Sequence, residues 1–303
     1  MIEIQNLSKR YGEKLAVNDI SFTVEPGIVT GFLGPNGAGK STTMRMIVGL
    51  DRPTSGGVTV NGKRYAEHHD PLHQVGSLLE AKAVHTGRSA YNHLLALAAT
   101  HSIPKSRVHE VIEMTGLEKV AGKRVGGFSL GMGQRLGIAA ALLGDPKTLI
   151  LDEPVNGLDP DGVLWVRQLT RYLASQGRTV FLSSHLMSEM ALTADHVIVL
   201  GRGRVLADAP MADLIGRAGT NRVTVRTPSP DALAAAIAGP DVTVTQLPDG
   251  ALSVEGIDAQ RIGEAAFLAG VQLYELSPVR ASLEQAYLEL TQDEVEYRAE
   301  VAA

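Results

Sequence analysis

The stretch Gly34-Pro35-Asn36-Gly37-Ala38-Gly39-Lys40-Ser41 decides the fold, since it fits the pattern G-x-x-x-x-G-K-[ST] at every fixed position. Its glycines allow positive φ angles, which turn backbone N–H groups toward a bound anion. The apolar run Ile28–Leu33 predicts a buried strand before the stretch, and Thr42–Gly49 predicts a helix after it. A helix that begins near Gly39 points the positive end of its dipole at the same place. The order of strand, loop and helix therefore predicts a site for the phosphates of a nucleotide.

Two side chains at the end of this loop suit a nucleotide that binds with Mg²⁺. Lys40 supplies a positive charge for the β- and γ-phosphates, and Ser41 supplies a hydroxyl ligand for the metal. A second segment, Leu149-Ile150-Leu151-Asp152-Glu153-Pro154, is an apolar run that ends in two adjacent carboxylates. Because open α/β sheets bind ligands at the carboxyl ends of their strands, Asp152 and Glu153 are predicted to serve as a Mg²⁺ partner and a general base.

The composition is that of a folded protein with one large or two ordinary domains. The chain has 303 residues, of which 44% are hydrophobic, and a net charge of -5 without a long run of one sign. This charge argues against a nucleic-acid surface, and the lack of cysteine excludes disulfides and thiolate metal sites. No segment approaches ~18 uninterrupted apolar residues, and the N-terminal residues lack a signal-peptide pattern, so we expect a cytoplasmic protein.

Strands and helices are predicted to alternate over the first two thirds of the chain. Residues 1–33 suggest several strands, and Val58–Val60 before Asn61 and Gly62 suggests a hairpin strand. Further strands are predicted at 148–152, 179–183, 196–200 and 203–207, with helices at about 160–175 and 187–193. This alternation predicts an α/β fold with a mostly parallel sheet, into which a helical subdomain at about 80–147 is inserted.

The composition shifts near Ala218–Thr220, which predicts a second domain over 219–291 and a polar tail over 292–303. The elements expected there follow the order βαββαβ, typical of a small α+β ferredoxin-like domain. They are Arg222–Arg226, Asp231–Ile237, Val242–Thr245, Leu252–Glu255, Ala259–Leu268 and Val271–Leu276, before a last helix over Ser282–Leu290. Four roles remain open for this domain: a dimer brace, a regulatory lobe, a lid near a partner, or a packed domain without a ligand.

Three further segments complete a set of motifs. They are Phe128–Arg135 before the apolar helix Leu136–Leu143, then Gly157-Leu158-Asp159, and then Ser183-Ser184-His185. Each is weak alone, because a Ser-Leu-Gly start is usually only an N-cap and a lone histidine is usually structural. Together with the loop and the acidic pair, in this order, they resemble the ATP-binding cassette (ABC) family over about residues 1–215. The resemblance implies a P-loop NTPase cassette over 1–218 that binds ATP and Mg²⁺.

The resemblance also implies the roles of individual residues. Tyr11 would stack on adenine, and the phosphates and Mg²⁺ would be held by Gly34, Pro35, Asn36, Gly37, Ala38, Gly39, Lys40, Ser41 and Thr42. Asp152 would assist the metal, Glu153 would polarise the attacking water, and His185 would orient the γ-phosphate and the water. In that family, ATP lies between two cassettes arranged head to tail. Ser129 and Gly131 would therefore reach the γ-phosphate of a second copy, and Asp159 would link the two sites of a homodimer.

Two departures from the family pattern stand out. Leu130 and Met132 replace a Gly and the Gln of the usual Leu-Ser-Gly-Gly-Gln signature. Glu80 stands where the family has a Gln, and a carboxylate can accept a hydrogen bond from a metal-bound water but cannot donate one. Both departures resemble the drug-resistance branch of exporters, which act on antibiotics such as bacitracin and daunorubicin. The segment Ser282–Thr291 is also similar to the end of those ATPases.

The resemblance implies an ATPase that powers export of a drug or other hydrophobic compound through a separate permease, from the inner face of the cell membrane. The alternative is a soluble ABC ATPase of translation or repair. A single cassette argues against the translation type, and the short interval from Lys40 to Ser129 without heptads argues against the repair type. A nucleotide-binding switch without hydrolysis is a third hypothesis, which only Glu80 supports.

Overall fold

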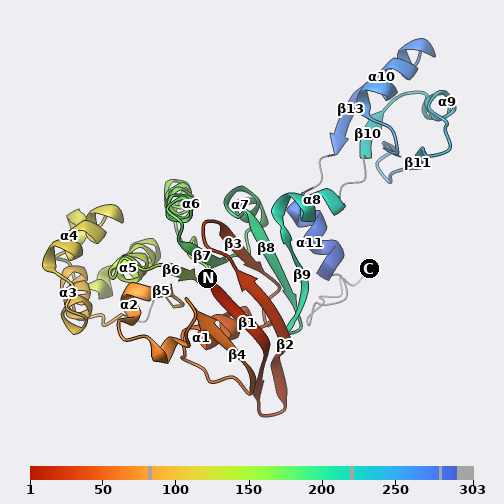
Figure 1. The fold of residues 1–303 in the computed structure, drawn as a ribbon. Coiled ribbons are helices and arrows are strands. Elements are labelled where there is room, and N and C mark those ends of the chain that lie inside the picture. Colours follow the sequence, from red (N-terminus) through yellow and green to blue (C-terminus); the bar gives the residue numbers. More distant parts are fainter. Residues whose placement is uncertain (81–83, 219–221, 280–281, 292–303) are drawn as a thin grey trace. The chain divides into compact units, whose positions relative to one another are not determined.

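The computed structural model describes residues 1–80, 84–218, 222–279 and 282–291 (Figure 1). Contacts divide the chain into two compact units, one built on Met1–Met211 and the other on Ala212–Glu289. No helix of the described residues is both long enough and apolar enough to cross a lipid bilayer.

A six-stranded sheet forms the centre of the larger unit among the described residues, in the order β5-β6-β7-β3-β8-β9. Its strands are β3 (Val29–Leu33), β5 (Val75–Leu78), β6 (Thr148–Leu151), β7 (Thr179–Ser183), β8 (His196–Gly201) and β9 (Arg204–Pro210). All neighbouring pairs are parallel except β8 and β9. The predicted, mostly parallel sheet is therefore confirmed, and the carboxyl ends of the adjacent strands β6, β7 and β3 lie at one edge.

A separate antiparallel sheet in the order β2-β1-β4 contains β1 (Ile2–Tyr11), β2 (Lys14–Val24) and β4 (Ser55–Val60). The sequence predicted strands here but not a second sheet. The two sheets share a core in which Phe22 of β2 meets Phe32 of β3, with ring centroids 5.7 Å apart. Helix α1 (Lys40–Ile47) contributes the buried Met44 to the same core, so the end of β3 and the start of α1 are firmly held.

Helices cover the sheet and form the predicted insertion (Figure 1). The insertion contains α3 (Ala90–Thr100), α4 (Lys105–Met114) and α5 (Leu130–Leu142), and the remaining helices are α2 (Pro71–Gln74), α6 (Pro160–Ser175) and α7 (Met187–Thr193). Helix α5 begins six residues before the predicted start at Leu136, which was wrong. Ser129 caps it by accepting a hydrogen bond from the N–H of Met132 at 3.2 Å, so the signature residues form its first turns.

The smaller unit has a four-stranded antiparallel sheet among the described residues, in the order β11-β12-β10-β13. Its elements are β10 (Arg222–Arg226), α9 (Pro230–Ala236), β11 (Thr243–Gln246), β12 (Leu252–Glu255), α10 (Ala259–Leu268) and β13 (Glu275–Val279), flanked by α8 (Met211–Ala218) and α11 (Leu283–Thr291). Each βαβ unit is split by one intervening strand, which confirms the ferredoxin-like pattern.

The last strand of this unit was predicted at Val271–Leu276, and that range is wrong. The strand β13 begins at Glu275, which pairs with Arg226 of β10. Val271 and Leu273 pack against the core from the connecting loop instead. Their burial explains why an apolar run was read as a strand.

Candidate nucleotide-binding site

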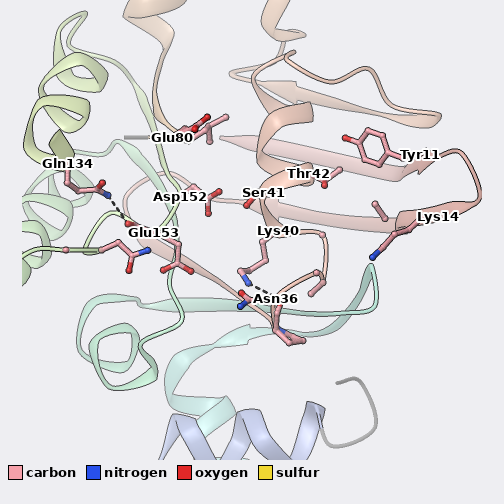
Figure 2. Close-up of a pocket in the computed structure, with 18 of the residues that line it drawn as sticks. Tyr11, Lys14, Asn36, Lys40, Ser41, Thr42, Glu80, Gln134, Asp152 and Glu153 are labelled. Carbon is pink, nitrogen blue, oxygen red and sulfur yellow. Dashed lines mark hydrogen bonds between the residues drawn. The ribbon is translucent and has the colours of Figure 1, made fainter. Parts of the chain in front are cut away.

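A cleft of about 650 Å³ lies at the carboxyl end of β3, within the size range of small-molecule sites (Figure 2). Most of the predicted site residues line it. They are Tyr11, Pro35, Asn36, Gly37, Ala38, Gly39, Lys40, Ser41, Thr42, Glu80, Asp152 and Glu153. The cleft therefore brings together residues from β1, the phosphate loop, the end of β5 and the end of β6.

The conformation of the phosphate loop requires glycine at specific positions. Gly37 and Gly39 have φ angles of 83° and 105°, which side chains disfavour. A Cβ atom on Gly39 would also come within 2.5 Å of the carbonyl oxygen of Ala16, and one on Gly34 within 2.4 Å of the carbonyl oxygen of Leu200. The loop is thus packed against neighbouring backbone on one side, while its other side faces the cleft.

Lys40 lies across the mouth of the loop. Its Nζ donates hydrogen bonds to the carbonyl oxygens of Gly34 at 2.5 Å and Pro35 at 3.2 Å (Figure 2). The side chain is buried, which lowers the pKa of the ammonium, while the nearby carboxylates of Glu153 and Asp152 act in the opposite direction. A buried cation between two carboxylates and the loop can readily exchange its carbonyl partners for phosphate oxygens.

The carboxylate of Asp152 and the backbone of Glu153 are joined by Ser183, a buried residue at the end of β7. Its Oγ donates to Oδ1 of Asp152 at 2.5 Å and accepts from the N–H of Glu153 at 2.9 Å. The serine keeps one carboxylate oxygen of Asp152 occupied and orients the other. In the sequence Ser183 stands out only as a neighbour of His185, so its role was missed.

His185 contacts the site through Glu153 and does not line the cleft itself. Its Nδ1 lies 2.7 Å from Oε2 of Glu153, and its N–H donates to the same oxygen at 3.3 Å. The predicted pair of a water-polarising carboxylate and an orienting histidine is thus brought together by the ends of β6 and β7.

Gln134 is a buried residue of α5 that was not among the predicted site residues. It lines the cleft, and its Nε2 donates to the carbonyl oxygen of Glu153 at 2.8 Å (Figure 2). The signal was present, since Gln134 lies within the segment Phe128–Arg135 that completes the motif set. Lys14 and Asn156 line the cleft as well and were also missed.

Tyr11 lies at the far end of the cleft from Glu153 (Figure 2). Its hydroxyl donates to Oδ2 of Asp51 at 2.8 Å, and Asp51 is paired with Arg45 at 2.8 Å. The ammonium of Lys9 lies 4.8 Å from the centroid of the ring. Partial burial and the Asp51 carboxylate raise the pKa of the phenol. The ring is therefore anchored at its edge, and with 46% of the residue exposed it can stack on a base.

Besides His185, four predicted residues lie outside the cleft lining, namely Gly34, Ser129, Gly131 and Asp159. Ser129 is exposed at the start of α5, and Gly131 follows in its first turn, where a Cβ atom would come within 2.8 Å of the carbonyl oxygen of Gly157. Asp159 caps α6 by accepting from the N–H of Gly162 at 3.0 Å. These residues do not contribute to the cleft of their own chain.

The residues present fit a magnesium ion that arrives with a nucleotide. Among the described parts of the chain, no three His, Cys, Asp or Glu side chains form a metal-binding group. Ser41 and Asp152 line the cleft and offer oxygen ligands. Mg²⁺ commonly binds through one or two protein ligands together with substrate phosphates and water, so such a partial set is sufficient.

Comparison with known proteins agrees with this geometry. A family model described as "ABC transporter" matches residues 17–156, and one described as a domain of unknown function matches residues 221–284. The bacitracin transport ATP-binding protein BcrA of Bacillus licheniformis is 42% identical over 71% of this chain and 71% of its own length. The Nod factor export ATP-binding protein I of a Rhizobium strain is 33% identical over 97% of this chain and 98% of its own.

A solved structure described as a dimeric bacterial ABC transporter cassette has a TM-score of 0.64 to this chain. Its sequence is 25% identical to this chain, and the match covers 70% of this chain and 99% of the solved one. The likeness in sequence and in fold therefore extends over the cleft and its surrounding elements.

Proposed function

Because this chain belongs to the ATP-binding cassette family, as an ATP-binding and ATP-hydrolysing transporter subunit, we propose that it powers a separate membrane permease that exports an antibiotic or another hydrophobic compound. The observation that carries the proposal is the cleft itself, which joins a phosphate loop, two carboxylates and a tyrosine platform. The relative named for bacitracin transport supports an antibiotic as the compound, and the relative named for Nod factor export supports the outward direction.

The proposed division of labour follows the positions of the side chains. The loop N–H groups and Lys40 bind the phosphates, and Tyr11 stacks on the base. Ser41, Asp152 and Glu80 would hold Mg²⁺ directly or through water, and the bound metal would supply positive charge to neutralise the phosphates. Glu153 accepts a proton from the attacking water, and His185 orients the water and the γ-phosphate. Phosphoryl transfer needs such positioning and charge neutralisation more than covalent chemistry by the protein.

The functional form that we propose is a homodimer with two shared sites. Ser129 and Gly131 lie at the start of α5 and outside the cleft of their own chain. A helix N-terminus binds anions well, so this start is suited to the γ-phosphate of a second copy. Asp159 would lie at the same interface. The permease partner would place the dimer at the inner face of the cell membrane.

The test is the rate of Mg-ATP hydrolysis per monomer, measured against protein concentration for the wild type and for Glu153→Gln. A rate that rises with concentration and is lost in the variant supports a two-subunit ATPase with Glu153 as the base. A rate in Glu153→Gln equal to that of the wild type contradicts the role of Glu153. Reconstitution with a candidate permease in vesicles then tests transport, and a permease that leaves the ATPase rate unchanged contradicts coupling.

A further inference from the structure

The backbone of Glu153 is held on both sides by side chains from other elements. Its N–H donates to Oγ of Ser183 at 2.9 Å, and its carbonyl oxygen accepts from Nε2 of Gln134 at 2.8 Å. Ser183 ends β7, whereas Gln134 belongs to α5. The N–H of Asn156, in the turn that follows, also donates to the carbonyl oxygen of Glu153 at 3.2 Å. The peptide groups before and after the Glu153 Cα atom are therefore fixed by two other parts of the fold and by the local turn.

This support is needed because Glu153 adopts an unfavourable backbone conformation. Its φ angle is 50°, in the left-handed region that residues with a Cβ atom seldom occupy. Such conformations persist only where the surroundings over-determine them. The conformation directs the carboxylate of Glu153 to His185 and leaves the residue on the wall of the cleft.

The amide that holds Glu153 belongs to the helix that begins with the signature segment. Gln134 lies five residues after Ser129 and is 3% exposed, so its side chain has little freedom to leave its partner. Near the start of the same helix, the side chain of Leu130 lies over Gly157, where an added Cβ atom would come within 2.3 Å of it. Helix α5 therefore supports the turn after β6 at two points, Glu153 and Gly157.

We propose that Gln134 is a positioning residue for ATP hydrolysis, which acts by holding the peptide carbonyl of Glu153 and thereby the direction of its carboxylate. The inference rests on the proposed role of Glu153 as the base. The positioning role also goes beyond the proposed function. Helix α5 would contact the nucleotide of the second copy at its start, and through Gln134 it would also hold the base in the site of its own copy. Gln134 needs no contact with the nucleotide to act in this way.

The experiment replaces Gln134 with Met, which has a similar length and no amide donor. A misplaced reacting group can cost on the order of 100-fold in rate, so we expect kcat to fall by about 10- to 100-fold. The dissociation constant for ATP should change less than about threefold. Gln168→Met, at an exposed position within α6, is the matched control and should retain the wild-type rate. Gln134→Asn withdraws the amide by one methylene and should also lower kcat, which keeps the test usable if the Met variant does not fold.

Two further measurements separate positioning from other roles. In a Glu153→Gln background, Gln134→Met should lower the residual rate no further, because the group that it positions is already removed. ATP-dependent dimerisation of Gln134→Met should be as strong as in the wild type, since the start of α5 is intact. A weaker dimer, a weaker ATP affinity or an additive loss in the double variant would overturn the inference in favour of a structural or direct binding role.

The two proposals fail in distinguishable ways. If Glu153→Gln hydrolyses ATP normally, the proposed function of Glu153 is wrong whatever Gln134 does. If Glu153→Gln is inactive while Gln134→Met and Gln134→Asn retain the wild-type kcat, only the positioning role is wrong.

Discussion

Oε2 of Glu153 accepts hydrogen bonds from both the ring and the backbone N–H of His185, with the ring Nδ1 at 2.7 Å and the backbone nitrogen at 3.3 Å. The proposed base and the residue that would orient its water are therefore partners of each other. The contact with the His185 ring holds the Glu153 carboxylate at the cleft wall. A water that enters between the ring and the carboxylate would replace this direct contact. The two residues should thus behave as one unit, with effects that are not additive.

Replacement of His185 by Ala should lower kcat for ATP hydrolysis by about 100-fold or more, because general acid–base positioning contributes roughly 10²- to 10⁴-fold. ATP affinity should change little, since His185 does not line the cleft. Steady-state rates and equilibrium nucleotide binding measure the two effects. A combined His185→Ala and Glu153→Gln variant that is far slower than either single variant would contradict their action as one unit.

The protein should take up protons when it binds ATP at alkaline pH, because Lys40 becomes protonated on binding. Burial lowers the pKa of its ammonium, and the charge of bound phosphates favours the protonated form. As the pH approaches the ordinary lysine pKa of ~10.4 from below, part of the free protein should lack this proton and regain it on binding ATP. ATP affinity should therefore decline as the pH rises through this range.

Calorimetry in two buffers with different ionisation enthalpies measures this proton uptake directly. Glu153→Gln removes a carboxylate that raises the pKa of Lys40, so its uptake should begin at a lower pH than in the wild type. Lys40→Met, which cannot bind the proton, serves as the control. Equal uptake in the wild type and in Lys40→Met would show that another group is responsible.

Tyr11 should contribute to ATP affinity through its ring and not through its hydroxyl. Stacking of a base on an aromatic side chain is worth about 1–3 kcal/mol, so Tyr11→Ala should weaken ATP binding by at least about fivefold. Tyr11→Phe keeps the ring and loses the hydrogen bonds of the hydroxyl with Asp51 and Thr42, so its affinity should stay within about threefold of the wild type. Titration with a fluorescent ATP analogue compares the three proteins. Unchanged binding in Tyr11→Ala would remove the stacking role.

The fit between Leu130 and Gly157 should appear as an energetic coupling. Gly157 has a φ angle of 73°, and an added Cβ atom would meet the Leu130 side chain. Gly157→Ala should therefore cost about 1–3 kcal/mol of unfolding free energy, and less in a Leu130→Ala background, where the backbone strain and the close approach of the Cβ atom of residue 130 remain. Denaturant unfolding of the four proteins measures the difference. Gly122→Ala, at a glycine with open space around it, is the control. An equal cost in both backgrounds would disprove the coupling.

Much of the larger unit could be predicted from the sequence because its signals are local. The alternation of apolar strands with helices predicted the parallel sheet, and Asp152 and Glu153 were located from a single apolar run. The separate sheet of β1, β2 and β4 was missed, since periodicity indicates a strand but not its partners. The apolar pattern placed the start of α5 at Leu136, because the turns before it contain glycines, which disfavour a helix. The N-cap that the Ser-Leu-Gly segment suggested is the actual start, at Ser129.

The sequence by itself determined the phosphate loop, because eight adjacent residues with glycines at fixed positions leave few backbone conformations for that segment. It also determined which side chains could serve a nucleotide and a metal. Only the tertiary structure decided that Gln134, Glu153 and Ser183 form one hydrogen-bonded group, and that Ser129 and Gly131 lie outside the cleft of their own chain. These relations join separate elements, and their geometry depends on how α5, β6 and β7 pack, which no spacing along the chain specifies.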